Sequence, residues 1–217
     1  MFAGEQRVDK PGTPVSIEIP LEVRGKEHPW VSRGGLKLDH ALGHFDIDVT
    51  GAVALDVGAS TGGFTDVLLS RGAAKVYAVD VGYGQLNWKL RSDDRVIVLE
   101  RLNARYMTDQ HVPEPVDIVV CDASFIGLEK VLATPLRFAA PGAHLAALIK
   151  PQFEVGKGEV GKGGIVRDPE LHLAVCARIE AWVAGMDCWQ VIGIEPSPVT
   201  GADGNVEFLI VARRENR

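Results

Sequence analysis

The stretch AVALDVGASTGGFTDVLLSRGAAKVYAVDVG (residues 52–82) decides the fold, because it contains two strand patterns on either side of one helix pattern. Residues 52–58 form an apolar run interrupted only by Asp56, which is typical of a strand buried on both faces. Residues 62–72 have the length and spacing of a short helix, and a second apolar run follows at residues 75–82. A strand, a helix and a strand in this order indicate two parallel strands joined by a crossover helix.

The same alternation continues along the rest of the chain. Further strands are predicted at residues 95–100, 116–122, 143–150, 188–197 and 205–213, and helices at residues 34–45, 128–139 (broken near Pro135) and 168–186. Asp168 and Pro169 are the residue types favoured at the cap and first position of a helix. Strands that alternate with helices form a mostly parallel sheet that is covered on both faces.

The two ends of the chain depart from this pattern. The last two predicted strands are separated only by the turn-rich residues 197–204, so we expect them to pair antiparallel. Residues 1–30 are rich in proline and β-forming residues, which predicts a short hairpin or extended arm and a linker. We therefore predict an N-terminal arm (residues 1–30) and one large α/β domain (residues 31–217).

A glycine-rich loop marks the first turn from strand to helix, in LDVGASTGGFTD (residues 55–66). Glycines allow a ligand to approach the backbone closely, and a helix N-terminus offers free N–H groups. Asp80 ends the next strand, where it can accept hydrogen bonds from ribose hydroxyls. A tight turn that needs glycine only for packing is the alternative, but the combination favours a nucleotide-like cofactor.

The details of this loop favour one class of cofactor. The dinucleotide fingerprint G-x-G-x-x-G is absent, since Gly58, Ser60 and Gly63 occupy its glycine positions. An acidic residue, Asp56, leads the loop instead, and an antiparallel terminal pair suits the sheet of S-adenosylmethionine-dependent methyltransferases. A methyltransferase is therefore favoured over an oxidoreductase. Residues 156–164 mimic a phosphate-binding loop, but a glycine replaces its Ser or Thr and no helix follows directly.

Charged residues lie at the ends of the predicted strands. Asp122 and Lys150 follow two neighbouring strands, and ligands bind at the carboxyl ends of strands in an open α/β sheet. Glu207 lies in an otherwise apolar strand, where a carboxylate is costly unless it is paired. Lys37 precedes the core and is a candidate partner. A structural ion-pair cluster, or unrelated surface charges, is the alternative interpretation of these four residues.

Such a group of charges suits methyl transfer to oxygen. A methyl sulfonium is already electrophilic, so the remaining task is to deprotonate the hydroxyl that attacks it. Partial burial and the nearby Lys37 would favour the neutral amine of Lys150, which could accept that proton or stabilise the developing alkoxide. Asp122 and Glu207 would orient the lysines. Alignment of oxygen, methyl and sulfur would supply most of the rate enhancement.

Seven segments in the same order resemble the TlyA family, a branch of the FtsJ-like ribose 2′-O-methyltransferases. They are WVSRGGLKL, LDVGASTGGFTD, AVDVGYGQLNWKLR, CDASFIGL, LIKPQFEVGK, KGGIVRDP and SPVTGADGNVEFL, and they cover about residues 30–213. The resemblance implies a Rossmann-like S-adenosylmethionine-dependent methyltransferase fold, with a seven-stranded sheet and an antiparallel C-terminal strand. It also implies S-adenosyl-L-methionine as the cofactor and cytidine 2′-hydroxyls of 16S and/or 23S ribosomal RNA as acceptors.

The resemblance also assigns residues to roles. The implied catalytic Lys-Asp-Lys-Glu tetrad is Lys37, Asp122, Lys150 and Glu207. The implied cofactor-binding residues are Asp56, Gly58, Ala59, Ser60, Gly62, Gly63, Phe64, Asp80 and, on the adenine side, Asn103. The family usually has an N-terminal RNA-binding domain of ribosomal-protein type, so residues 1–30 are expected to be the remnant of one.

Composition sets limits on partners. The net charge of −6 is not typical of a nucleic-acid-binding protein, so RNA contacts would depend on scattered basic residues near the crevice, unless these are only solvated surface charges. They are Arg24, Lys26, Arg33, Lys157, Lys162 and Arg167. Trp30 and Tyr83 are candidates to stack on a base, although Trp30 is equally suited to anchor the linker.

Other functions are less well supported by the sequence. The three cysteines form no CxxC pair and the six histidines are scattered, so we predict no metal and a cytoplasmic location. No apolar run approaches the roughly 20 residues that span a bilayer, so we predict no membrane partner. Two alternatives stay open: a methyltransferase that acts on tRNA or a small molecule, and a non-catalytic, haemolysin-like membrane-active or RNA-binding protein.

Overall fold

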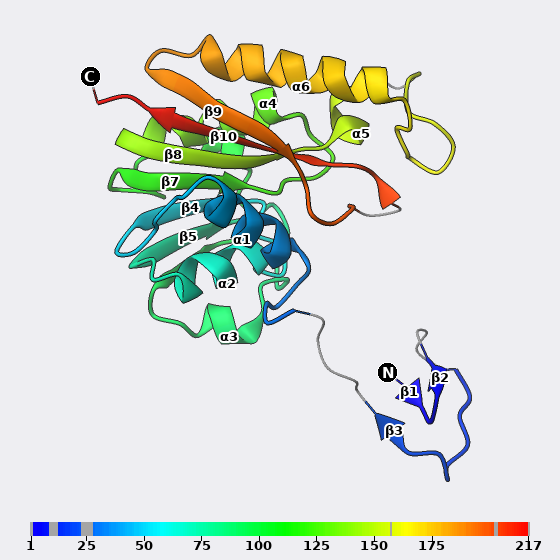
Figure 1. Cartoon of the computed structure of the whole chain (residues 1–217). Helices are drawn as coiled ribbons and strands as arrows, with labels where there is room; N and C mark the ends of the chain where they lie inside the picture. Colours follow the sequence, from blue (N-terminus) through cyan, green and yellow to red (C-terminus); the bar gives the residue numbers. More distant parts are fainter. Residues whose placement is uncertain (1, 9–12, 23–27, 157, 202–203, 217) are drawn as a thin grey trace.

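The central feature of the computed structural model is a seven-stranded sheet with helices on both faces (Figure 1). The structure describes residues 2–8, 13–22, 28–156, 158–201 and 204–216. The strands of this sheet are β4 (Val53–Val57), β5 (Lys75–Val79), β6 (Val96–Leu99), β7 (Val116–Cys121), β8 (Ala139–Ile149), β9 (Trp189–Pro196) and β10 (Phe208–Arg214). The predicted α/β architecture is therefore confirmed.

The strand order is β6-β5-β4-β7-β8-β10-β9. Strands β4 to β8 pair in parallel, whereas β10 pairs antiparallel with both β8 and β9, as the short link between the last two strands predicted. After β4 the chain adds β5 and β6 on one side of that strand, and it then adds β7 on the other side. Ligands bind beside the carboxyl ends of the strands at such a switch point, so the topology places a crevice after β4 and β7.

Each face of the sheet buries its own apolar core, because successive strand residues point to opposite sides. In β7, Ile118 and Val120 face one core, and Val119 and Cys121 face the other. The first core is covered by α1 (Gly34–His44), α2 (Gly63–Ser70) and α3 (Trp88–Arg91), and the second by α4 (Leu128–Leu132) and α6 (Pro169–Ala184). As expected, Asp168 caps α6, accepting a hydrogen bond from the backbone N–H of Glu170.

The break predicted near Pro135 is confirmed, since the helix ends at Leu132 and a separate 3₁₀ turn, Pro135–Phe138, follows it. Proline lacks the N–H that a continuing helix would need. Two other local features differ from the sequence prediction. The short helices α3 and α5 (Pro151–Glu154) were not predicted, because four residues are too few for helical periodicity. Glu207 directly precedes β10 instead of lying inside it.

The N-terminal segment forms a small antiparallel sheet of its own. It consists of β1 (Phe2–Ala3), β2 (Gln6–Arg7) and β3 (Leu21–Glu22), with β1 between the other two. This agrees with the short hairpin predicted within residues 1–30, of which residues 9–12 and 23–27 lie outside the described residues. The origin of residues 1–30 as an RNA-binding remnant stays a prediction.

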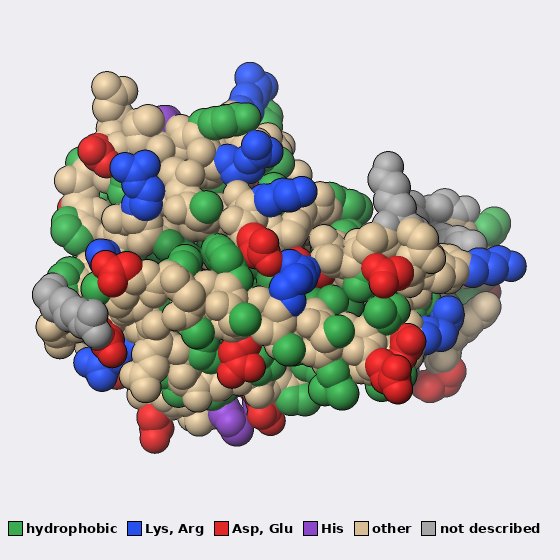
Figure 2. Space-filling view, turned by 90° about the horizontal axis from the view of Figure 1, so that it is seen from above, with side chains coloured by type: hydrophobic (Ala, Val, Ile, Leu, Met, Phe, Trp, Pro, Cys, Tyr) green, Lys and Arg blue, Asp and Glu red, His purple; other side chains and the backbone are tan. Residues whose placement is uncertain are grey.

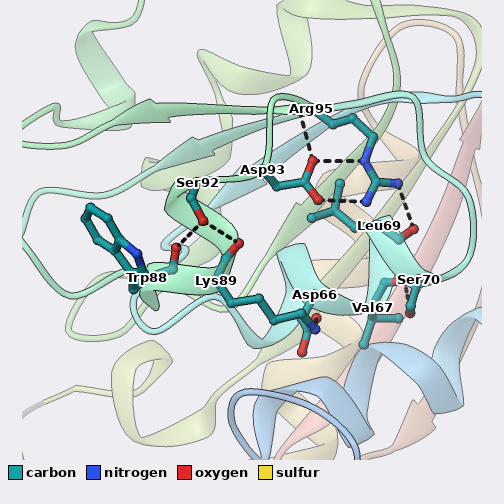
Figure 3. Close-up of polar contacts among 9 residues, drawn as sticks. All are labelled: Asp66, Val67, Leu69, Ser70, Trp88, Lys89, Ser92, Asp93 and Arg95. Atoms are coloured by element: carbon teal, nitrogen blue, oxygen red, sulfur yellow. Dashed lines mark hydrogen bonds and ion pairs between the residues drawn. The ribbon is translucent and has the colours of Figure 1, made fainter.

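A buried aspartate connects three segments of the first layer. Asp66 of α2 is only 4% exposed. It accepts hydrogen bonds from the backbone N–H of Val31 at 2.9 Å and from Lys89 Nζ at 3.1 Å, the latter shown in Figure 3. Trp30 lies against α1 so closely that a Cβ at Gly35 would be 2.3 Å from its ring. The linker is thus anchored to the sheet domain, which is the structural role considered for Trp30.

A helix that crosses a membrane must be long, about 20 residues, and mostly apolar. Within the described part of the chain, no helix combines the length and the apolar character needed to cross a bilayer.

Candidate active site

The glycine-rich loop after β4 is held in place by its own backbone and by Asp80. Gly58 has a φ of +81°, and a Cβ at this position would lie 2.8 Å from the Cα of Ala123, so only glycine fits. The N–H groups of Gly58 and Ala59 donate to the carbonyl of Val79. Asp80 accepts hydrogen bonds from the N–H of Ser60 at 2.8 Å and of Gly82 at 2.7 Å. This carboxylate therefore fixes the loop as well as lining the crevice.

A cavity of about 470 Å³ opens beside this loop. Gly58, Ser60, Asp80 and Asn103 contribute its polar rim, and apolar residues such as Ile126 line the rest. The side chain of Asn103 accepts a hydrogen bond from the N–H of Arg105 at 3.1 Å, which orients its amide. An apolar slot with a few oriented polar groups is the usual form of a nucleoside-binding pocket. We call it the cofactor cavity.

Two residues expected to contact the cofactor lie behind the loop instead. Asp56 is fully buried, accepts a hydrogen bond from Thr65 Oγ1 at 2.6 Å, and has its pKa raised to about 7 by burial. Gly62 (φ +95°) lies so close to Leu86 and Leu90 that a side chain would collide with them. Of the described residues proposed for cofactor binding, these two line neither cavity of the site. Their place is to support the turn.

A second cavity of about 360 Å³ brings the four charged residues together. Lys37, Asp122, Lys150 and Glu207 all line it, along with Ala59, Gly63 and Phe64 of the loop. Lys150 Nζ lies 2.6 Å from Asp122 Oδ1 and donates to the Asp122 carbonyl and to Ser124 Oγ, each at 3.0 Å. Lys37 Nζ lies 2.6 Å from Glu207 Oε2. We call this the tetrad cavity.

The sheet topology explains how residues so far apart in the sequence meet. Asp122 and Lys150 directly follow the parallel strands β7 and β8, so they emerge at the same edge. Strand β10 runs the opposite way, and Phe208 pairs with Ile149, so Glu207 reaches that edge from the beginning of its strand. Helix α1 brings Lys37 there because its start lies against the loop: a Cβ at Gly63 would be 2.9 Å from the N of Gly35.

The tetrad is balanced in charge and largely hidden from water. Lys37, Lys150 and Glu207 are each less than 9% exposed. Charges this deeply buried are stable only when each has a partner, and here two ammonium groups face two carboxylates. The Gln152 amide also lies 3.4 Å from Glu207 Oε1. The only component of the tetrad with appreciable access is Asp122, whose side chain is 22% exposed.

Several residues of the site were not predicted from the sequence. Ser124, Phe125 and Gln152 line the tetrad cavity. Phe125 is 89% exposed, has a φ of +65°, and its ring lies 5.0 Å from that of Phe153. A large exposed aromatic in the left-handed region is unusual, and residues held in this region cluster at functional sites. No local sequence pattern signals it, because it lies in an irregular loop.

The two cavities adjoin each other. Gly58, Ser60, Asp122, Ser124 and Phe125 line both. A group held in the cofactor cavity would thus be next to Lys150 and Asp122. The arrangement thus places a cavity of nucleoside size beside a buried amine and its charged partners.

Comparison with known proteins gives the class. The FtsJ-like methyltransferase family model matches residues 30–214, so the chain belongs to this family. Solved methyltransferases with little sequence similarity share the fold, for example one from Listeria monocytogenes with a TM-score of 0.57 at 12% identity. The methyltransferase prediction is thereby confirmed, and so is the sheet with its antiparallel C-terminal strand.

Within that family, the chain is similar to TlyA proteins. It is 49% identical to the 16S/23S rRNA (cytidine-2′-O)-methyltransferase TlyA of Mycobacterium tuberculosis, over 98% of this chain and 81% of that protein. It is 41% identical to Hemolysin A of Brachyspira hyodysenteriae, over 89% and 79%. A solved protein from Lactococcus lactis with a provisional hemolysin name superposes with a TM-score of 0.82 at 42% identity, covering 87% and 90%. The resemblance to the TlyA family is confirmed.

Proposed function

We propose that the chain transfers a methyl group from S-adenosylmethionine to the 2′-hydroxyl of a cytidine in ribosomal RNA. The observation that supports this most directly is the Lys37–Glu207 and Lys150–Asp122 pair of contacts beside the glycine loop. The acceptor is taken from relatives whose names state a cytidine 2′-hydroxyl of 16S or 23S rRNA.

The residues of the cofactor cavity fit S-adenosylmethionine. Its ribose hydroxyls suit a carboxylate at Asp80, and its adenine suits an apolar slot beside the oriented amide of Asn103. Gly58 lines this cavity with its backbone alone, so a ligand can approach the chain closely there. When bound, this cofactor supplies a methyl group on a positively charged sulfur.

The tetrad then handles the proton of the acceptor. Lys150 lies near the junction of the two cavities, where its amine can accept a hydrogen bond from an alcohol or donate one to it. Its contacts with Asp122 and Ser124 orient the side chain. In its neutral form it removes the hydroxyl proton, and in its charged form it stabilises the alkoxide. Lys37, held by Glu207 in the same cavity, adds a second positive charge near the developing oxyanion.

The mouth of the tetrad cavity suits a nucleotide. Phe125 offers an exposed ring on which a base can stack, and Arg33 lines the same cavity. Lys162 and Arg167 are exposed, whereas Arg24, Lys26 and Lys157 lie outside the described residues. On the face shown in Figure 2, basic and acidic side chains are interspersed, which agrees with the net charge of −6. The RNA contacts proposed here are therefore the local ones at the cavity mouth, Phe125 and Arg33.

Lys150→Ala tests the assignment. We expect methyl transfer from S-adenosylmethionine to purified ribosomal subunits to fall by about 100-fold or more, since general acid–base catalysis contributes about 10²–10⁴-fold. Binding of S-adenosylmethionine, measured by calorimetry, should stay within a few-fold of the parent. Lys150→Arg keeps the charge but cannot supply a neutral amine, so it should also fail.

Product analysis identifies the acceptor. Methylation of the ribose protects the adjacent phosphodiester from alkali, so labelled, alkali-resistant dinucleotides beginning with cytidine are expected. A label confined to bases, or found only in tRNA, would contradict the proposed acceptor. Single-turnover transfer at the parental rate by Lys150→Ala would contradict the role of the amine.

A further inference from the structure

A cluster of potential metal ligands lies outside the methyltransferase site. His40 and His44 are four residues apart on α1, and Glu195 lies on the edge strand β9. One ligand atom from each of the three side chains lies within 4.8 Å of the other two. The sequence suggested that the histidines were scattered, but this pair has the spacing that puts two imidazoles on one face of a helix.

We propose that His40, His44 and Glu195 form a binding site for a divalent transition-metal ion, with Zn²⁺ as the preferred ion. Two imidazole nitrogens and one carboxylate oxygen are a ligand set that Zn²⁺ accepts, with a water in the fourth position. Mg²⁺ and Ca²⁺ prefer oxygen ligands alone, so they should bind poorly.

The geometry is close to what such an ion needs. A tetrahedral ion about 2.0–2.2 Å from each ligand separates the ligand atoms by roughly 3.4 Å. His44 Nε2 is 3.9 Å from Glu195 Oε2, so these two side chains need to approach each other by only about 0.5 Å. Both side chains are more than a third exposed and free to make that adjustment.

The contacts of the cluster leave the ligand atoms available. A separation of 3.9 Å is too long for a hydrogen bond between His44 and Glu195. The rings of His40 and His44 are stacked with centroids 5.6 Å apart, which aligns the two imidazoles along the helix. Within the part of the chain that the structure describes, no hydrogen bond engages these three side chains.

A bound ion would join α1, which carries Lys37, to β9, which pairs with the strand that follows Glu207. Phe45, at the end of α1, already lies against β9, since a Cβ at Gly193 would be 2.9 Å from its ring. Helix α1 carries Lys37 one turn before His40, and Glu195 pairs with Leu209, two residues after Glu207. A metal bridge between α1 and β9 would therefore hold together the two sides of the Lys37–Glu207 pair.

Titration with Zn²⁺ tests the proposal on the full chain after treatment with a chelator. We expect one ion per chain by calorimetry and a higher unfolding temperature with Zn²⁺ than without it. Mg²⁺ should produce neither effect. Loss of even an outer partner of a metal ligand typically costs about 10–100-fold in affinity, so His44→Ala and Glu195→Gln should weaken Zn²⁺ binding by at least about 100-fold.

Two control variants separate this site from other Zn²⁺ ligands. His111→Ala removes a histidine outside the cluster, and Cys188→Ser removes the partly exposed thiol. Both should bind Zn²⁺ as the parent does. Zinc binding that survives His44→Ala, or that is lost with Cys188→Ser, would overturn the proposal, as would the absence of any binding. The unfolding temperature of each variant without metal shows whether it is folded.

Discussion

At the scale of single residues, the surroundings of a side chain decide what it can contact more than its residue type does. Asp56, Asp80 and Asp122 all belong to strand ends near the crevice, but the structure gives them different surroundings. Asp80 faces the cofactor cavity, Asp122 faces Lys150, and Asp56 is sealed behind the loop with Thr65. Sequence alone identified all three, yet it could not show which way each carboxylate points.

The cofactor role proposed for Asp80 gives a first prediction. Asp80→Ala should weaken S-adenosylmethionine binding by about tenfold or more, because it removes the ribose partner and frees the N–H groups of Ser60 and Gly82. Asp80→Asn keeps one acceptor and should have a smaller effect. Calorimetric titration of both variants measures this, and parental affinity in Asp80→Ala would show that the ribose is held elsewhere.

The buried carboxyl of Asp56 gives a prediction for pH. Burial raises its pKa from 3.8 to about 7, so the folded state holds the proton more tightly than the unfolded chain. This contribution to stability is complete below pH 3.8 and is lost as the pH rises to about 7. Asp56→Asn removes the titration but keeps the size of the side chain.

Relative to the parent, Asp56→Asn should therefore gain stability by roughly 1.4 kcal/mol for each pH unit between pH 5 and 7. Denaturant unfolding at several pH values gives the difference between the two proteins. A difference that does not change with pH would mean that the carboxyl stays ionised in the folded state.

At the scale of elements, the site depends on how α1 and α2 meet. The start of each helix lies against the other, and Asp66 adds a connection to the linker and to α3. These contacts place Lys37 and the glycine loop at the same edge. The helices were predictable from periodicity, but the connection was not, since it joins residues 35 positions apart.

Asp66→Ala tests this connection. It should lower the free energy of unfolding by about 1–3 kcal/mol, because the partly buried N–H of Val31 loses its acceptor. Lys89→Ala is the matched control: it removes the other partner, whose side chain is 72% exposed, and should cost less than about 1 kcal/mol. Chemical denaturation measures the free energy of unfolding of both variants. Equal losses of stability would mean that the Asp66–Lys89 ion pair, and not the hydrogen bond to Val31, accounts for the effect.

At the scale of the whole molecule, much of the fold followed from the sequence. Apolar runs gave the strands, and the parallel topology then placed their polar ends together, which brought Asp122 and Lys150 into one cavity. Ser124, Phe125 and Gln152 escaped prediction because loop conformation is set by tertiary contacts. The histidine–glutamate cluster also escaped, since Glu195 joins it only through the antiparallel register of β9 and β10.

The order of strands has a consequence for the newly made protein. Strand β10 follows β9 in the chain but lies between β8 and β9 in the sheet. While the polypeptide is still emerging from the ribosome, β9 has no neighbour to pair with, and Lys37 has no carboxylate until Glu207 has been added. The last strand, β10, must therefore be made before β9 can pair with a neighbour and before the tetrad can assemble.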